Sequence, residues 1–274
     1  MAKPPSSVKR SKSRTQKLLQ RWVVKLGTGI LTTPEGQLDL PQIGQLVSQV
    51  ARLRRQGIQV VLVSSGAIGA GMGILKLAKR PKAIEELQAC AAIGQPRLMG
   101  IYAELFAKHR MFVAQILLTY LDLDSRSLYA NGQKTVSHLL RLDSGSYVPI
   151  INENDVVSHE EIKFGDNDQL SAHVAVMVRA DRHIILSNVP GLTENSDGSG
   201  TPIPHVPKID DRIVALAGKT TSERSVGGMI TKLNAARIVN AEGIPMHIAH
   251  GRTKDILLKL AAGDKIGTLF GKIC

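Results

Sequence analysis

Short apolar runs rich in β-branched residues alternate along the chain with longer segments of helical period. This alternation is typical of a parallel sheet covered by helices, and right-handed crossovers then give a three-layer αβα sandwich around a mainly parallel sheet. In such an α/β fold ligands bind at the carboxyl ends of the strands, so a site is expected in the loops that follow them. The runs that predict strands are residues 22–26, 60–63, 112–118, 147–151, 183–186 and 246–249.

Several segments between these runs have helical period and recognisable ends. Two helices are predicted at residues 40–56 and 229–242. Asp39 suits the start of the first helix and Gly57 suits its end, because both residues satisfy capping preferences. Residues 83–109 are longer, and the Gly-Gln-Pro break at 94–96 predicts that they form two helices.

The first 21 residues differ from the rest of the chain in charge. They carry seven lysines and arginines and no acid, within a chain of formal charge +12. A segment so rich in Ser, Lys and Pro cannot bury apolar area, which predicts a disordered basic tail ahead of a single domain over residues 22–274. A contact with nucleic acid or an anionic surface is the alternative for this tail, and an organelle transit peptide is a third possibility.

Composition also excludes several classes of protein. No window approaches the roughly 18 apolar residues of a membrane span, and no apolar signal region follows the basic start. Cys90 and Cys274 have no spacing that suggests a disulfide framework or a zinc site. A soluble, cytoplasmic protein without a membrane partner is expected.

Lys25 stands near the end of the first predicted strand, and Gly27 and Gly29 follow in the loop after it. A lysine at the end of a buried strand is costly unless an anion compensates its charge, and the glycines let backbone amides approach that anion. The motif is not the dinucleotide-binding fingerprint, since Thr32 stands at the third glycine position. A lysine that extends its charged end to the surface is the alternative.

The loop after the second strand, residues 64–73, has four glycines and two serines, one of them Ser65. Hydroxyls and exposed amides after a strand suit an anion or a substrate carboxylate. An ordinary flexible loop explains the same composition equally well.

Two short stretches, residues 152–155 and 165–168, gather Asn and Asp side chains. They flank a predicted β-hairpin, and they could bind a metal, hold a substrate ammonium group or orient lysines. Two Asx-rich turns are the structural alternative.

The segment from Val226 to Lys232 places two glycines before a helix whose first turn holds Thr231 and Lys232. Free amides, the helix dipole and a lysine make such a start favourable for phosphate. The segment is not a Walker A loop.

Together and in this order, the four loops resemble those of the amino acid kinase family, over residues 22–270. In detail they look like the members that use ATP and Mg²⁺ to phosphorylate the side-chain carboxylate of L-glutamate, the opening step of proline biosynthesis. The matching pieces are Val24-Lys25-Leu26-Gly27-Thr28, Ser65-Gly66-Ala67-Ile68, Ile151-Asn152-Glu153-Asn154-Asp155, Gly165-Asp166-Asn167-Asp168, Gly227-Gly228-Met229 and Thr231-Lys232.

The resemblance implies a role for each matched residue. Lys25 and Lys232 would stabilise the transferring phosphoryl group, and Asp168 would hold both lysines. The residues implied for the glutamate pocket, in the N-terminal part, are Ser65, Asp155, Asn167, Asn152 and Asp166. The residues implied for ATP, mainly in the part from residue 180 onward, are Lys25, Gly27, Ser187, Asn188, Val226, Gly227, Gly228, Met229, Ile230, Thr231 and Lys232.

The chain also departs from the family pattern. Ser187-Asn188 stands where many relatives have Thr-Asp, and Val226 replaces a threonine, so that a hydroxyl contact to the nucleotide would be lost. Many bacterial relatives continue into a PUA domain, whereas this chain is expected to be a catalytic domain only. The resemblance further implies a homo-oligomer and, as the next enzyme, glutamate-5-semialdehyde dehydrogenase.

Two other functions compete with this interpretation. The first is a sibling kinase for N-acetylglutamate, aspartate or a nucleoside monophosphate, although two acidic loops suit a free ammonium group better. The second is a basic nucleic-acid-binding or regulatory protein on the same scaffold, which the tail and the two departures in the nucleotide loops motivate. We expect nucleic acid not to be a partner.

Overall fold

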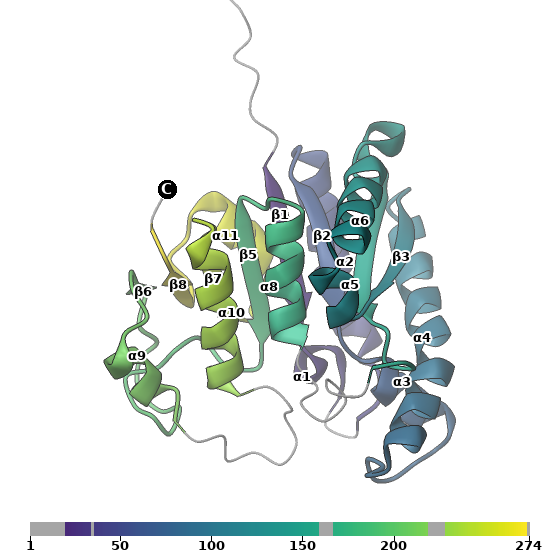
Figure 1. Ribbon diagram of the computed structural model, residues 1–274, viewed down its shortest axis with the longest axis horizontal. Coiled ribbons are helices and arrows are strands. Elements are labelled where there is room, and N and C mark those ends of the chain that lie inside the picture. Colours follow the sequence, from purple (N-terminus) through teal and green to yellow (C-terminus); the bar gives the residue numbers. More distant parts are fainter. Residues whose placement is uncertain (1–19, 34–35, 159–166, 219–227, 273–274) are drawn as a thin grey trace, which may run out of the picture.

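The computed structural model of this chain describes residues 20–33, 36–158, 167–218 and 228–272. Within them the strands form one sheet in the order β3-β4-β2-β1-β5-β7-β8-β6 (Figure 1). All neighbouring strands are parallel except β7 and β8, which are antiparallel. The strands are β1 (Arg21–Leu26), β2 (Gln59–Ser64), β3 (Phe112–Leu118), β4 (Tyr147–Glu153), β5 (Arg182–Ser187), β6 (His205–Val206), β7 (Met246–His250) and β8 (Thr268–Phe270).

Helices cover both faces of this sheet. One face carries α2, α4 and α11, and the other carries α6, α8 and α10 (Figure 1). The predicted αβα sandwich around a mainly parallel sheet is therefore confirmed. The helices are α1 (Thr28–Leu31), α2 (Leu40–Arg55), α3 (Ala67–Ile74), α4 (Ile84–Ala107), α5 (Tyr120–Asp124), α6 (Arg126–Leu139), α8 (Asn167–Met177), α9 (Asp211–Leu216), α10 (Met229–Ala241) and α11 (Ile256–Ala262), with a short 3-10 turn η1 (Leu142–Gly145).

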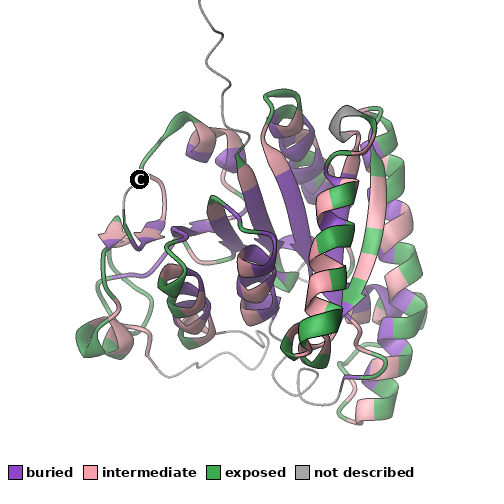
Figure 2. Cartoon of the chain, turned by 45° about the horizontal axis from the view of Figure 1, so that its top comes forward, coloured by how far each residue is buried: buried purple, intermediate pink, exposed green. Residues whose placement is uncertain are grey.

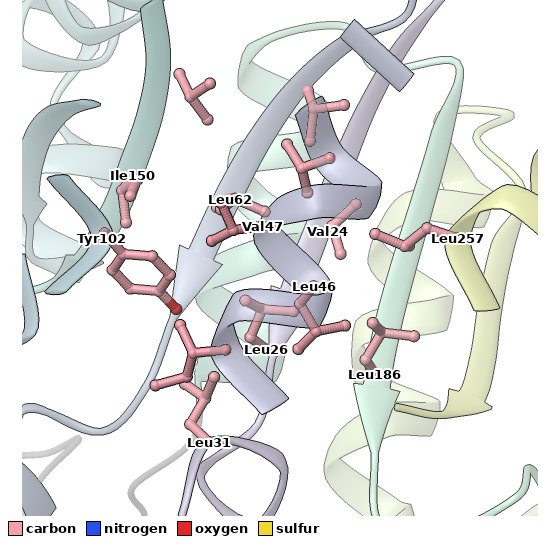
Figure 3. Packing of buried hydrophobic residues seen from close by; sticks show 14 of the residues in the cluster. Val24, Leu26, Leu31, Leu46, Val47, Leu62, Tyr102, Ile150, Leu186 and Leu257 are labelled. Atoms are coloured by element: carbon pink, nitrogen blue, oxygen red, sulfur yellow. The ribbon is translucent and has the colours of Figure 1, made fainter. Parts of the chain in front are cut away.

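The central strands are buried on both faces, as Figure 2 shows for the middle of the sheet. In β1, Val24 packs into the cluster under α2, whereas Val23 packs into the cluster under α8. Figure 3 shows the first of these clusters, to which both Val24 and Leu46 of α2 belong. Since successive strand residues point to opposite faces, Lys25 lies on the α8 side with Val23.

The six predicted strands and the two capped helices are all present, with ends within two residues of the prediction. At the start of α2, the side chain of Asp39 accepts a hydrogen bond from the Gln42 amide at 3.1 Å. None of the helices among the described residues is long and apolar enough to cross a membrane.

The predicted break at 94–96 is wrong, because α4 continues through Pro96 as one helix of 24 residues. The glycine of the break serves close packing instead. A Cβ on Gly94 would lie 1.9 Å from the carbonyl oxygen of Ala67 in α3. Tertiary contact with α3 thus holds a helix that the local sequence alone would divide.

The glycine-rich segment after β2 is a helix rather than a loop. Gly66 is the N-cap of α3 and adopts the left-handed conformation with φ of 106°, which glycine tolerates best. A Cβ on Gly71 would lie 1.9 Å from the carbonyl oxygen of Cys90 in α4. Gly71 of this segment and Gly94 of α4 thus both serve the crossing of α3 and α4, which follows β2 directly in the chain.

Candidate active site

Two buried lysines converge on one buried carboxylate at the carboxyl edge of the sheet. Lys25 Nζ lies 2.5 Å from Asp168 Oδ1, and Lys232 Nζ lies 2.9 Å from Asp168 Oδ2. The three side chains are 8%, 5% and 0% exposed for Lys25, Lys232 and Asp168. Each carboxylate oxygen therefore has its own lysine, and the cluster carries one net positive charge.

Three elements deliver these side chains to one point. Lys25 ends β1 and faces α8, where Asp168 occupies the first turn. Lys232 lies in the first turn of α10, which packs beside α8 on the same face of the sheet. The carboxyl end of a central strand thus meets two helix N-termini, the usual place for a ligand in an open α/β sheet.

The charge of Asp168 is set by opposing effects. Burial alone would raise its pKa, but the charges and hydrogen bonds of Lys25 and Lys232 outweigh burial and hold the pKa well below its ordinary value. Asp168 is therefore ionised at neutral pH and fixes both ammonium groups.

The start of α10 adds further polar groups to the cluster. Thr231 Oγ1 lies 3.2 Å from Asp168 Oδ2 and 2.8 Å from the carbonyl oxygen of Gly228. Gly228 is the N-cap, and among the described residues no side-chain capping hydrogen bond is made at the start of α10. Met229 is half-buried, whereas Ile230 is exposed. The arrangement leaves backbone donors beside Lys232, as a phosphate site requires.

Gly27 lies on the other side of Lys25. Its amide donates to the carbonyl oxygen of Leu186 in β5 at 3.1 Å. A Cβ at this position would be 3.3 Å from that oxygen and 3.6 Å from Lys25 Nζ. Glycine therefore leaves the space next to the lysine ammonium group open.

A second network of amides lies next to the lysine cluster. Asn167 Nδ2 donates to Asn152 Oδ1 at 2.8 Å, to the carbonyl oxygen of Ser64 at 2.9 Å and, at 3.3 Å, to Ser65 Oγ. Asn152 Nδ2 in turn donates to Gln95 Oε1 at 2.8 Å. Since Asn167 and Asp168 are consecutive, the first turn of α8 joins the amide network to the lysines.

The remaining candidates lie around these two networks or outside the described residues. Asp155 is half-buried in the turn after β4. Ser187 is the last residue of β5 and Asn188 follows it, with Ser187 Oγ 3.3 Å from Asn188 Oδ1. Asp166, Val226 and Gly227, as well as most of the predicted hairpin and basic tail, lie outside the described residues.

The sequence matches a family model over residues 20–250, described as the amino acid kinase family. The chain belongs to the amino acid kinase family. This result confirms the resemblance that the loops suggested. Among solved structures, a UMP kinase from Bacillus anthracis aligns with a TM-score of 0.59 and 14% identity, over 93% of this chain and 97% of that one. At this identity the likeness supports the fold alone.

Curated relatives within the amino acid kinase family are much more similar in sequence. A glutamate 5-kinase from Clostridium acetobutylicum is 45% identical over 92% of this chain and 94% of its own length. One from Symbiobacterium thermophilum is 45% identical over 92% and 96%. One from Methylococcus capsulatus is 46% identical over 91% of this chain and 67% of its own.

Sequence analysis missed several side chains that support this amino acid kinase site. Gln95 contacts Asn152 from within α4, but it stood in a segment that predicted a helix break. Tyr102 bonds Ser64 Oγ at 2.8 Å, and Figure 3 shows its hydroxyl directed toward the end of β2. In a sequence, a tyrosine in an apolar helical segment indicates a core residue. Only its hydroxyl group, which needs a hydrogen-bond partner when buried, could have pointed to a polar contact.

Proposed function

We propose that this amino acid kinase transfers the γ-phosphoryl group of ATP to the γ-carboxylate of L-glutamate. The products are γ-glutamyl phosphate and ADP, and the reaction is the first step of proline biosynthesis. The observation that carries the proposal is the buried Lys25–Asp168–Lys232 cluster, which continues directly into the amide network through α8. Identities of 44–46% to curated glutamate 5-kinases support the choice of acceptor.

Phosphoryl transfer to glutamate requires charge neutralisation and alignment of the substrates, but no general base. The γ-carboxylate of glutamate, with a pKa of about 4.3, is already ionised at neutral pH. Phosphoryl transfer spreads negative charge over the equatorial oxygens while the attacking and leaving oxygens stand in line. In this proposal Lys25 and Lys232 neutralise that charge, and Asp168 keeps both ammonium groups in place.

The acceptor pocket in this proposal lies on the amide-network side of α8. Ser65 and Asn167 contact glutamate, and Asp155 binds its ammonium group. Asn152 orients the Asn167 side chain, because Oδ1 of Asn152 accepts a hydrogen bond from Nδ2 of Asn167. Asp166 remains a predicted member of the same pocket.

The nucleotide pocket in this proposal lies between β5 and the start of α10. The residues that we assign to ATP are Lys25, Gly27, Ser187, Asn188, Val226, Gly227, Gly228, Met229, Ile230, Thr231 and Lys232. Mg²⁺, which would balance charge on the phosphates, keeps several waters and often binds through substrate phosphates. Among the described residues no group of three or more His, Cys, Asp or Glu side chains is placed to hold a metal. Asp168 is engaged by two lysines, so we propose that Mg²⁺ is held mainly by ATP.

The test measures ADP release and traps the acyl phosphate with hydroxylamine. The protein is incubated with ATP, Mg²⁺ and, in separate reactions, L-glutamate, N-acetylglutamate, aspartate or UMP. We expect ADP release that depends on L-glutamate and a product recovered as the γ-hydroxamate. Faster turnover with N-acetylglutamate, aspartate or UMP would reassign the substrate.

Further properties of the family member are proposals of the same kind. We propose a homo-oligomer in the cytoplasm whose product is consumed by glutamate-5-semialdehyde dehydrogenase. Acyl phosphates hydrolyse readily, so a reductase that uses the product without delay fits this chemistry. The basic nucleic-acid-binding function is not favoured beside the kinase similarities.

A further inference from the structure

A buried histidine lies behind the lysine cluster, in the middle of the sheet. His183 of β5 is fully buried on the α8 side, and its Nε2 lies 2.8 Å from Ser171 Oγ. Ser171, also fully buried, donates its hydroxyl hydrogen to the backbone carbonyl oxygen of Asp168 at 2.7 Å. A chain of two hydrogen bonds thus connects the sheet to the residue that holds both lysines.

The direction of these bonds follows from the number of hydrogens. The single hydroxyl hydrogen of Ser171 is used by the Asp168 carbonyl, so the hydrogen between Ser171 and His183 must come from Nε2. The other ring nitrogen, Nδ1, has no hydrogen-bond partner among the described residues, and it carries no hydrogen when the ring is neutral. Burial lowers the pKa of His183 to about 3, which keeps the ring neutral at physiological pH.

The strand register gives the position of His183 relative to the active site. In the β1–β5 register, His183 pairs with Val23, and Ile185 pairs with Lys25. His183 therefore lies under α8, two strand residues before the level of Lys25. It supports the first turn of α8, where Asn167 and Asp168 begin the two networks of the site.

Burial of the His183 ring is expected to lower the stability of the folded protein. A buried polar atom without a partner destabilises a protein, and an apolar residue would fill the same place between Val23 and Met246 without that cost. Such exceptions among buried polar groups often mark a functional constraint. Among the described residues, the one hydrogen bond of the His183 ring leads through Ser171 to the backbone of Asp168.

We propose that His183 is a positioning residue for phosphoryl transfer. By donating to Ser171 it orients the serine hydroxyl onto the Asp168 carbonyl, and so fixes the first turn of α8. Asp168 then presents its two oxygens to Lys25 and Lys232 in one geometry. The expected effects on kinetics rest on the proposed function. The hydrogen-bond chain from His183 to Asp168 does not depend on that function.

The test compares three variants with a matched control. His183→Leu removes the donor, Ser171→Ala removes the link, and His183→Gln keeps an amide donor near the position of Nε2. His247→Leu is the control, since His247 is a buried strand histidine whose Nδ1 likewise has no hydrogen-bond partner within the part of the chain that the structure describes. Met246 and Ile248 pack on the α10 side, so His247 points to the opposite face, away from Asp168.

We expect His183→Leu and Ser171→Ala to lower kcat about 10- to 100-fold, as a misplaced catalytic group does, with smaller changes in both KM values. His183→Gln should recover most of the rate, and His247→Leu should keep it. In the Ser171→Ala background, His183→Leu should cost little more, because the chain is already broken. ¹⁵N NMR of the wild type should report His183 as the neutral Nε2–H tautomer.

Hydrogen exchange at the Ala172 amide, which in α-helical geometry donates to the Asp168 carbonyl in α8, gives a readout that needs no substrate. It should be faster in His183→Leu than in the wild type and unchanged in His247→Leu. Normal kcat in a folded His183→Leu protein, an equal loss in His247→Leu, or no recovery with His183→Gln would overturn the proposal. If His183→Leu does not fold, the Gln and Ser171→Ala variants decide. A wild type inactive with glutamate would reject the proposed function, while hydrogen exchange would still judge the positioning role.

Discussion

Asp168 holds two lysine charges that the interior would otherwise tolerate poorly. Each of its oxygens contacts one ammonium group, at 2.5 Å for Lys25 and 2.9 Å for Lys232. Removing one partner of a buried ion pair typically costs about 3–5 kcal/mol, because the other charge stays buried and uncompensated. Here the carboxylate compensates two lysines at once, while the cluster keeps a net positive charge that suits a phosphoryl group. Stability and function thus depend on the same contacts.

Lys25 should act mainly on the transition state, because the negative charge that it meets grows as the phosphoryl group moves. We expect Lys25→Met to lower kcat by about 10²- to 10³-fold or more, as for loss of a preorganised donor, with a much smaller change in KM for glutamate. Steady-state kinetics measure the effect. The methionine keeps most of the aliphatic stem, so circular dichroism and melting should show an intact fold. A near-normal kcat in that folded variant would return Lys25 to a purely structural role.

Asp155 should act mainly on glutamate binding. Its proposed partner, the substrate ammonium group, has the same charge in the ground state and in the transition state. The interaction therefore stabilises both states equally. We expect Asp155→Ala to raise KM for glutamate several-fold, about 10-fold for a loss of about 1.4 kcal/mol, with little change in kcat. Initial rates at varied glutamate and at varied ATP separate the two substrates. An effect confined to the KM for ATP would place Asp155 outside the acceptor pocket.

At the scale of elements, the crossing of α3 and α4 depends on two glycines. Gly71 and Gly94 allow backbone to approach backbone, since a Cβ on either would lie 1.9 Å from a carbonyl oxygen of the other helix. Gln95 follows Gly94 directly and bonds Asn152, so the crossing also sets one wall of the amide network. Gly71, one of the four glycines after β2, thus serves helix packing.

Two alanine substitutions in α4 separate this packing from helix propensity. Gly94→Ala should destabilise the protein by about 1–3 kcal/mol or more, because its new methyl group meets backbone atoms that cannot move alone. Gly100→Ala is the control, since a Cβ there meets no atom within 4 Å. It should stabilise the protein by about 0.5–1 kcal/mol through helix propensity. Urea unfolding of both variants measures the difference, and equal effects would show that the crossing tolerates a side chain.

At the scale of the whole molecule, two buried strand histidines couple stability to pH. Burial lowers the pKa of His183 to about 3 and that of His247 to about 4. Between those values and the ordinary histidine pKa of about 6.5, only the unfolded chain binds the proton. Stability is therefore lost as pH falls through this window. The lowered pKa of Asp168 adds its own loss only below the ordinary aspartate range.

We expect each histidine to remove up to about 2 kcal/mol of stability between pH 6.5 and pH 5. Urea unfolding at pH 7 and pH 5 measures the total change. His247→Leu should reduce the loss of stability between pH 7 and pH 5 by the contribution of one histidine, without altering the active-site cluster. Stability that is equal at the two pH values would show that the buried rings are protonated in the folded protein as well.

Much of the architecture follows from short-range patterns in the sequence. The buried strands could be recognised because apolar β-branched runs mark positions covered on both faces, and α2 because Asp39 and Gly57 satisfy its ends locally. Lys25 and Lys232 could be singled out for a similar reason, as a lysine in a buried strand and a lysine after a glycine pair each point to an anion. The family resemblance then supplied the role of Asp168, although not its place in a helix.

The sequence by itself predicted six of the strands, the capped helices α2 and α10, and the carboxyl ends of the strands as the place where a ligand would bind. Only the tertiary structure decided that α4 runs through Pro96, that the segment after Gly66 is a helix, and that Gln95 and His183 stand behind the site. The physical reason is the range of the interactions. Strand patterns and helix caps act between near neighbours, whereas the approach of α3 to α4 and the chain from His183 to Asp168 depend on residues that meet only after folding.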